Sequence, residues 1–444
     1  MIRGHHHLAG IGGVGMSALA RALAGHGAEV TGSDRFLDAG QPTPALEKLR
    51  RAGFALAAQD GSALRPDTRA LVLSTAIEKD NAEVRRAAEL GVPVVHRAEM
   101  LARLVGGGTC IAVTGTAGKT TVTGLVGWVL ECAGMNPSVV NGGAVVNWVT
   151  DTELGNARIG SPHLWVIEAD ESDRSLLQFE PDWAVITNIS KDHFELDEVT
   201  ALFRQFAGRV RRGVVGCFGE PPAEKLLAGF APRLTAQGSL FQHRGEEYAV
   251  PLLGRHNAEN ALEAVELCLR LGLEPATIRN ALAGFRGIER RLEPAGTAAG
   301  ISVIDDYAHN PAKIRAALTA LAPYHGRILA AWRPHGYGPL ALMKDELLAM
   351  FAETLRPPDM LFVLPVFYAG GTARRVFTSG EFVEALRARG LRAEYAPDFD
   401  ALEARLARQA EKGDAILVMG ARDPGLPAFA RRLVSTIGRR VPGA

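Results

Sequence analysis

The stretch AVTGTAGKTTVTG, residues 112–124, places a lysine and two threonines directly after a glycine-rich turn. Backbone N–H groups of such a turn can surround phosphate oxygens, a lysine can neutralise them, and a hydroxyl can bind Mg²⁺. The usual loop begins with a glycine where Val113 stands, so a glycine turn without a ligand is the alternative. The pattern favours a nucleotide-phosphate site formed by Gly115, Thr116, Gly118, Lys119, Thr120 and Thr121.

Polar side chains follow two later apolar runs, LWVIEAD and WAVITNI. The carboxyl ends of parallel strands are where open α/β sheets bind ligands, and carboxylates beside a phosphate lysine suit Mg²⁺. A histidine beside Mg²⁺ is unusual, so His193 taken alone also fits a surface or helix-capping residue. The candidates are Glu168, Asp170 and Glu171 after the first run, and Asn188, Asp192 and His193 after the second.

The segment GIGGVG, residues 10–15, follows a predicted strand and precedes a predicted helix, and Asp34 ends the next strand. Glycines let a backbone approach a diphosphate at a helix N-terminus, and an acidic residue can bind a ribose hydroxyl. The motif indicates a nucleotide diphosphate. An NAD-dependent oxidoreductase and a tight turn without a ligand are the alternatives.

Three further stretches contain polar residues at predicted element ends. The helix that starts near His256 carries Asn257 and Asn260, which are also common capping residues. The segments ERR at 289–291 and DDYAHNP at 305–311 read as the edge of a site, although the arginine pair could simply be solvated. His5, His6 and His7 lie in a predicted strand, where the first and third face opposite to the second, so they cannot easily share a metal.

The elements that must position these residues form three blocks, each alternating apolar strands with amphipathic helices. The pattern predicts an α/β protein of three domains: an N-terminal Rossmann-like domain, a central P-loop-type ATP-binding domain with a parallel or mixed sheet, and a C-terminal Rossmann-like domain. The predicted boundaries are residues 1–104, 105–290 and 291–444, with Gly106, Gly107 and Gly108 marking the first linker.

The composition excludes several classes of protein. The chain has 444 residues, 49 lysines and arginines, and 49 aspartates and glutamates, and this balance disfavours nucleic-acid partners. No apolar segment is long enough for membrane insertion, and the four cysteines are scattered without a CxxC pair. We expect a cytoplasmic protein, either a monomer or a homodimer.

In their order along the chain, these motifs resemble those of the Mur ligases, the ATP-dependent amide-forming enzymes of peptidoglycan synthesis. The resemblance covers nearly the whole chain and is strongest to the members that attach L-alanine to UDP-N-acetylmuramic acid. The family's phosphate loop is a shortened one, which accounts for Val113. The segments that carry the resemblance are GIGGVGMSALA, STAIEKDNAEV, RAEMLARL, EADESD, TNISKDH, HNAENALEA, DDYAHNP and RPHGY.

The resemblance implies roles for individual residues, with ATP and Mg²⁺ as cofactors. Lys119, Glu168, His193 and Arg291 are implied to be catalytic, and Thr120, Glu168 and His193 to hold the metal. Asn257, Asn260, Arg291 and Asp306 are implied to join the phosphate loop in binding ATP. The UDP-sugar is implied to contact Gly12, Gly13, Val14, Gly15, Asp34, Ser74 and Thr75, and the amino acid to lie near His309, His335 and Tyr337.

Several positions depart from the pattern of the alanine-adding members. Ala117 and Asn310 each replace a histidine, and Gly336 and Gly338 stand where basic residues are typical. Arg422 and Asp423 replace the usual GAGNI stretch. A ligase that attaches another amino acid or a recycled peptide is therefore an alternative, and a non-catalytic UDP-sugar binder is a third possibility.

Overall fold

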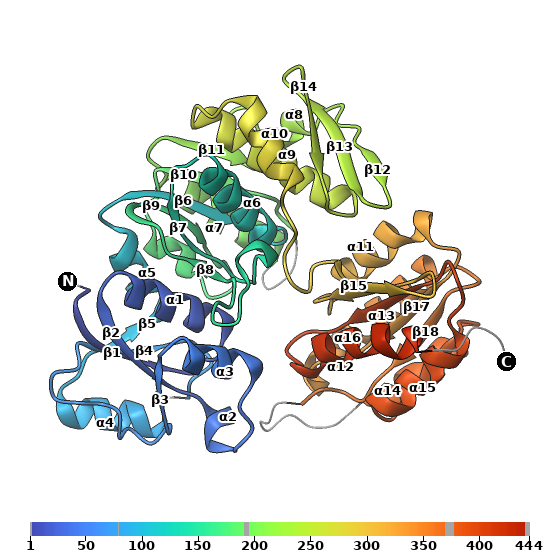
Figure 1. Cartoon of the computed structure of the whole chain (residues 1–444), viewed down its shortest axis with the longest axis horizontal. Helices are drawn as coiled ribbons and strands as arrows, with labels where there is room; N and C mark the ends of the chain where they lie inside the picture. Colours follow the sequence, from blue (N-terminus) through green and yellow to red (C-terminus); the bar gives the residue numbers. More distant parts are fainter. Residues whose placement is uncertain (1, 79, 191–194, 369–376, 440–444) are drawn as a thin grey trace. The chain divides into compact units, whose positions relative to one another are not determined.

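The computed structural model describes residues 2–78, 80–190, 195–368 and 377–439. Contacts divide the chain into two compact units (Figure 1). The first contains two mainly parallel sheets, and the second contains one. The first unit comprises residues 1–232, 240–251 and 257–288, and the second comprises residues 233–239, 252–256 and 289–444.

The N-terminal sheet has five parallel strands in the order β3-β2-β1-β4-β5. Helices α1, α3 and α5 pack their apolar side chains on one face, and α4 covers the other (Figure 1). Its strands are β1 (Gly4–Ala9), β2 (Ala28–Ser33), β3 (Ala55–Ala57), β4 (Ala70–Leu73) and β5 (Val94–His96); its helices are α1 (Val14–Gly25), α2 (Arg35–Asp38), α3 (Pro44–Arg51), α4 (Ala82–Leu90) and α5 (Arg97–Val105).

The second sheet of the first unit has the order β11-β10-β6-β9-β7-β8, and only its edge strand β8 pairs antiparallel. Its inner strands are continuous apolar runs because both faces are buried. One apolar core runs from the N-terminal sheet into this one. The elements are β6 (Thr109–Thr114), α6 (Lys119–Cys132), β7 (Pro137–Val140), β8 (Ala157–Arg158), β9 (Ser161–Glu168), β10 (Trp183–Ile186), α7 (Leu196–Ala207) and β11 (Gly213–Gly216), with short 3₁₀ turns at Val146–Trp148 and Ser175–Gln178.

A small three-stranded sheet and three helices follow β11 in the chain. The strands are β12 (Arg233–Thr235), β13 (Gly238–His243) and β14 (Glu246–Val250), and the helices are α8 (Ala223–Leu226), α9 (Arg255–Arg270) and α10 (Pro275–Ala283). Helix α10 packs on α6 through the Trp128 indole, which donates to the Ala281 carbonyl at 2.7 Å.

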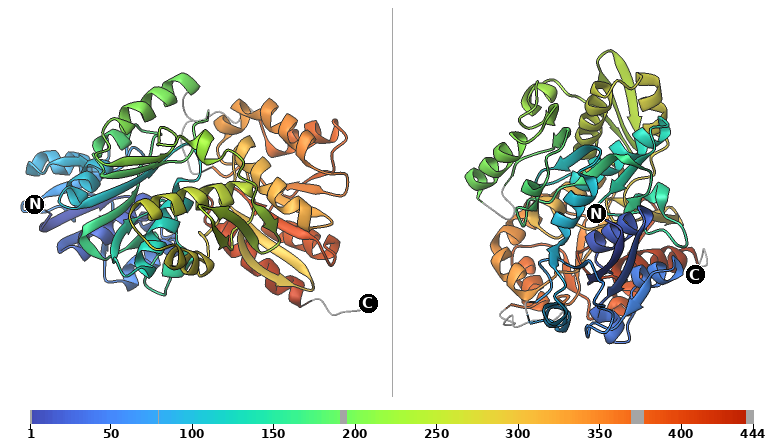
Figure 2. Two further views of the ribbon diagram at one scale, coloured as in Figure 1. Left: turned by 90° about the horizontal axis from the view of Figure 1, so that it is seen from above. Right: turned by 90° about the vertical axis from the view of Figure 1, so that its left-hand side faces the viewer.

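The sheet of the second unit has the order β15-β16-β20-β17-β18-β19, and only β15 is antiparallel. Its two faces carry separate apolar cores, one under α11, α13 and α14 and the other under α15 and α16 (Figure 2). The strands are β15 (Glu293–Ala298), β16 (Ile301–Asp306), β17 (Ile328–Trp332), β18 (Met360–Val363), β19 (Ala393–Tyr395) and β20 (Ala415–Met419); the helices are α11 (Pro311–Leu321), α12 (Tyr337–Leu342), α13 (Lys344–Thr354), α14 (Ser379–Arg387), α15 (Phe399–Gln409) and α16 (Gly425–Gly438), with a 3₁₀ turn at Ala322–Tyr324.

The predicted α/β class is confirmed, including every strand that the sequence pattern assigned. The antiparallel strand β15 was not predicted, because EPAGTA shows no apolar alternation and contains proline and glycine. The first two predicted domains fall within one unit, so the boundary near residue 104 stays a prediction. Among the described residues no helix is long and apolar enough to cross a membrane.

Candidate functional site

The turn between β6 and α6 is held against the end of β10. The Asn188 side chain accepts from the Ala117 N–H at 3.0 Å and donates to the Ala117 carbonyl at 2.9 Å. Asn188 Oδ1 also accepts from the Thr116 hydroxyl at 2.6 Å, and the Thr187 hydroxyl donates to the Ala117 carbonyl at 2.6 Å. These bonds fix the loop's backbone without using the N–H groups of Gly118 or Lys119.

Two glycines of this loop are required by its geometry. Gly115 has a φ of 133° and Gly118 a φ of 83°, which other residues rarely adopt. A Cβ on Gly115 would overlap the Thr187 hydroxyl, and one on Gly118 would overlap the Asn260 side chain. The turn therefore requires glycine at both positions, and it leads into the N-terminus of α6, the end of a helix whose N–H groups favour anions.

The Lys119 ammonium lies between a carboxylate and a backbone carbonyl. It donates to Glu171 Oε2 at 2.6 Å and to the Gly115 carbonyl at 2.9 Å. Burial acts to lower the pKa of Lys119, but Glu171, Glu168 and Asp170 outweigh it and the pKa is raised. The predicted proximity of the strand-end carboxylates to this lysine is thus observed.

Thr120 and Glu168 both contact the turn that follows β7. The Thr120 carbonyl accepts from the Asn141 side chain at 3.2 Å, and Glu168 Oε2 accepts from the Gly142 N–H at 2.8 Å. A hydroxyl and a carboxylate are the hard oxygen donors that Mg²⁺ prefers, with phosphate and water completing its shell. His193 lies outside the described residues, and no group of three potential histidine, cysteine or carboxylate ligands occurs within them.

Asn257 and Asn260 lie on the first turns of α9. The Asn260 side chain abuts Gly118 and donates to Asn257 Oδ1 at 3.3 Å. Both are buried, with 4% and 7% exposure. The structure therefore brings Asn260 to the phosphate loop, which a capping role would not require.

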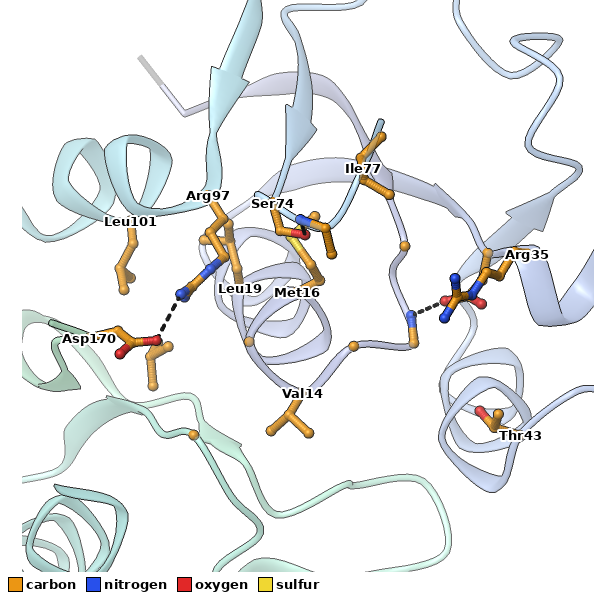
Figure 3. Close-up of a pocket in the computed structure, with 18 of the residues that line it drawn as sticks. Val14, Met16, Leu19, Arg35, Thr43, Ser74, Ile77, Arg97, Leu101 and Asp170 are labelled. Atoms are coloured by element: carbon orange, nitrogen blue, oxygen red, sulfur yellow. Dashed lines mark hydrogen bonds and ion pairs between the residues drawn. The ribbon is translucent and has the colours of Figure 1, made fainter. Parts of the chain in front are cut away.

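The glycine turn between β1 and α1 opens into a cavity of about 520 Å³ (Figure 3). Apolar side chains of α1 and polar groups from both sheets of the first unit line it. Of the predicted residues, Thr75 is exposed and does not line the cavity. The lining includes Gly12, Gly13, Val14, Gly15, Asp34, Ser74, Ile77, Arg97, Asn141, Glu168 and Asp170.

The Asp34 carboxylate organises the turn. Its Oδ2 accepts from the Gly12 N–H at 3.0 Å, a bond drawn in Figure 3, and its Oδ1 accepts from the Phe36 N–H at 3.0 Å. The side chain is buried, with 5% exposure. Asp34 thus supports the loop and caps α2. Its predicted contact with a ribose hydroxyl stays a prediction.

Arg97 supplies a positive charge to this cavity and was not singled out from the sequence. It points towards Asp170, with its guanidinium 3.5 Å from that carboxylate (Figure 3). Asp170 precedes Glu171, the partner of Lys119, so one short segment touches both the cavity and the phosphate loop. An arginine at the start of α5 has no spacing signal of its own, because its partner lies on a distant strand.

In the second unit, Arg291 precedes β15 and Asp306 ends β16, so both lie at the end of this antiparallel pair opposite its hairpin turn. Asp306 accepts from the Leu292 and Ala308 N–H groups, both at 2.7 Å, and burial raises its pKa. The Arg291 guanidinium stacks over Tyr307 at 5.5 Å from the ring centre. Asp306 is therefore a buried brace for the Arg291 segment, and its predicted contact with ATP stays a prediction.

His309 and His335 are brought together by the same sheet. Their rings are 5.1 Å apart in an edge-to-face arrangement, and His309 Nδ1 is bonded to the Tyr307 carbonyl at 2.9 Å. Burial lowers the pKa of His309 to about 3 and that of His335 to about 4. Tyr337 begins α12 and lies beside Tyr368.

The departures near residue 423 have a structural account. The Asp423 carboxylate pairs with Arg333 at 2.6 Å and accepts from the Gly425 N–H at 2.8 Å, at the start of α16. Arg422 adopts a φ of 64°. Asn310 accepts from the Lys313 N–H at 3.0 Å and caps α11. Asp423 and Asn310 thus each stabilise the start of a helix, α16 and α11 respectively.

Comparison with known families matches three segments. Residues 5–108 match the Mur ligase family catalytic domain, residues 113–203 the Mur ligase middle domain, and residues 290–422 the Mur ligase glutamate ligase domain.

Whole-chain relatives agree with these matches. A UDP-N-acetylmuramate–L-alanine ligase of Cyanothece sp. is 34% identical, covering 98% of this chain and 97% of its own. One of Rhizobium meliloti is 35% identical, covering 94% and 93%. The crystal structure of the UDP-N-acetylmuramate–alanine ligase of Thermotoga maritima has a TM-score of 0.80 at 26% identity, covering 97% and 98%. A murein peptide ligase of Psychrobacter arcticus shares the fold, with a TM-score of 0.66 at 23% identity, covering 98% and 99%.

Proposed function

The chain belongs to the Mur ligase family, and we propose that it joins L-alanine to the carboxylate of UDP-N-acetylmuramic acid with ATP as the activating substrate. The observation that carries this proposal is the 34–35% identity with ligases of that name over nearly the full length of both chains. The phosphate loop and the glycine-turn cavity of the first unit support it.

The reaction divides into two transfers. The sugar-nucleotide carboxylate attacks the γ-phosphorus of ATP, which forms an acyl phosphate and releases ADP. The amine of the amino acid then attacks the acyl carbon, and the tetrahedral intermediate collapses with loss of phosphate and a proton. Lys119 and the N–H groups at the start of α6 neutralise the transferred phosphoryl group, so catalysis is mainly positioning and charge stabilisation.

Thr120 and Glu168 are the residues that we assign to Mg²⁺, together with His193, which lies outside the described residues. The metal would supply charge neutralisation for the β- and γ-phosphates. Glu171 is placed to hold Lys119 charged and pointing across the loop, at 2.6 Å from its ammonium.

We assign the cavity beside the glycine turn to the UDP-sugar. The N–H groups of the first turn of α1, which has no side-chain cap, and the Arg97 guanidinium suit a diphosphate, and the apolar α1 wall suits a ring. We assign His309, His335 and Tyr337 to the amino-acid side and Arg291 to ATP. The expectation of a cytoplasmic monomer or homodimer stays a prediction.

Phosphate release from Mg–ATP with UDP-N-acetylmuramic acid tests the proposal, with single amino acids and short murein peptides as acceptors. We expect turnover that requires the sugar nucleotide and is highest with L-alanine. Preferred turnover with another amino acid or a peptide would replace the proposal with a divergent ligase of the same family.

Lys119→Ala provides the residue-level test. We expect ATP turnover to fall at least a hundredfold, because the charge on the transferred phosphoryl group loses its cation. Binding of UDP-N-acetylmuramic acid, measured by calorimetry, should stay within about twofold, since the cavity lining does not include Lys119. Lys225→Ala, an exposed lysine on α8, is the matched control and should retain full turnover. If Lys119→Ala weakened binding of UDP-N-acetylmuramic acid as strongly as it lowered ATP turnover, the assignment would be contradicted.

A further inference from the structure

A chain of buried polar side chains lies between β1 and α4, on the face of the N-terminal sheet away from α1. His5 bonds to Thr68 and Thr31, each at 2.8 Å. His7 bonds to the same Thr31 hydroxyl at 2.7 Å and to Glu83 Oε1 at 2.7 Å. Both histidine side chains face α4, as the strand alternation predicted, and both have at most 2% exposure.

The distances fit a continuous donor-to-acceptor order along these side chains. With Glu83 as a carboxylate, His7 donates from Nε2 and its Nδ1 accepts from the Thr31 hydroxyl. The Thr31 oxygen then accepts from His5 Nε2, and His5 Nδ1 accepts from the Thr68 hydroxyl. Glu83 lies in the first turn of α4, where the helix dipole favours a carboxylate.

Glu83 also connects this chain to the glycine turn. Its second oxygen, Oε2, accepts from the Ser33 hydroxyl at 2.8 Å. The Ser33 carbonyl accepts from the Gly10 N–H at 2.8 Å and the Ile11 N–H at 2.9 Å. The next residue, Asp34, holds the following glycine of the turn. Ser33 is fully buried at the end of β2. Glu83 therefore fixes the residue whose carbonyl holds the backbone of the glycine turn.

We propose that Glu83 is a positioning residue for the sugar nucleotide, acting through Ser33 on the backbone of the glycine turn. The inference rests on the proposed function only for the identity of the ligand. Glu83 does not line the cavity, so its effect must pass through Ser33 and the turn. His7 of the HHH segment orients Glu83 by bonding to its other oxygen, Oε1.

If these side chains had only a structural role, removing any one of their hydroxyls would have the same effect on binding of the sugar nucleotide. Thr68 is the matched control, because it is buried to 5% exposure in the same chain but lies at the end remote from Ser33. Ser33→Ala and Thr68→Ala each remove one buried hydroxyl, and both should lower the unfolding midpoint by a few degrees. Only the first should change the glycine turn.

Calorimetric binding of UDP-N-acetylmuramic acid to the full-length variants tests this. We expect the Kd of Ser33→Ala to rise about tenfold, the equivalent of one hydrogen bond, and that of Thr68→Ala to stay within about twofold. Glu83→Gln can accept from His7 and donate to a reversed Ser33 hydroxyl, so it should bind within about threefold of wild type. Glu83→Ala can do neither and should bind at least as weakly as Ser33→Ala.

Unchanged binding in Ser33→Ala, or equal weakening in Thr68→Ala, would overturn the positioning role even if Glu83→Ala does not fold. Binding by the wild type without amide formation would overturn the proposed function alone. A wild type that does not bind UDP-N-acetylmuramic acid would overturn both.

Discussion

At the residue scale, burial acts to lower the pKa of Lys119, His309 and His335 alike, but the net shift is upward for the lysine and downward for the histidines. Lys119 is kept charged because the carboxylates around it outweigh the loss of hydration. His309 and His335 have no carboxylate among the causes of their shifts, and nearby cations act in the same direction as burial. The first unit therefore presents a cation to phosphate, and the second presents neutral imidazoles.

The neutral state of His309 gives a prediction about pH. Its pKa of about 3 lies below the ordinary value of 6.5, so between these values the unfolded chain takes up a proton that the folded chain does not. This contribution to stability is present above pH 6.5 and is lost as the pH falls towards 3. His309→Asn removes it, so the variant's unfolding midpoint should fall less steeply with acid than that of the wild type. Parallel midpoint-against-pH curves would contradict the burial of a neutral imidazole.

At the element scale, the phosphate loop depends on contacts from two other elements. The end of β10 bonds its backbone, and the start of α9 packs against Gly118. The loop is thereby preorganised, so little ordering free energy remains to be supplied by the nucleotide.

A pair of glycine substitutions separates backbone strain from this packing. Gly118 and Gly134 have positive φ values of 83° and 76°, so alanine at either costs about 1 kcal/mol of stability. A Cβ on Gly134 meets no atom within 4 Å, whereas one on Gly118 overlaps Asn260. We expect Gly134→Ala to retain ATP turnover and Gly118→Ala to lose at least tenfold in kcat/KM for ATP. Equal kinetics in both variants would show that the α9 contact is unimportant.

At the scale of the whole molecule, the two units have separate apolar cores. The first contains a core that joins two of its sheets and a smaller core under α4, and the second has one core on each face of its sheet. Such a chain need not unfold in one transition, and a ligand held within one unit stabilises that unit by mass action.

Differential scanning calorimetry with added nucleotides tests whether a ligand stabilises the first unit separately. It also tests the oxidoreductase alternative. UDP-N-acetylmuramic acid at about one hundred times its Kd should stabilise the first unit by about 2.7 kcal/mol and raise its transition. NAD at the same concentration should leave every transition within the error of the measurement. A clear shift with NAD would show that the glycine-turn cavity accepts a dinucleotide.

Much of this molecule follows from local sequence. Strand, glycine turn and helix occur together at residues 4–25 and 109–132 because apolar periodicity and glycine placement are properties of short segments. The carboxylates Glu168 and Glu171 were expected near Lys119 because they follow the carboxyl end of a predicted parallel strand, and Glu171 is its partner. The opposite facing of His5 and His6 followed from the two-residue repeat of a strand.

Other features were decided only by tertiary structure. Arg97 meets Asp170, Asn260 meets Gly118, and Glu83 meets both His7 and Ser33 across 73, 142, 76 and 50 residues of sequence. Asp34 proved to brace the glycine turn, where its spacing had suggested ribose binding alone. Residue types and spacing determine which elements form and which chemistry they carry. Which side chains then meet depends on how sheets and helices pack, because those contacts join segments that have no sequence period in common.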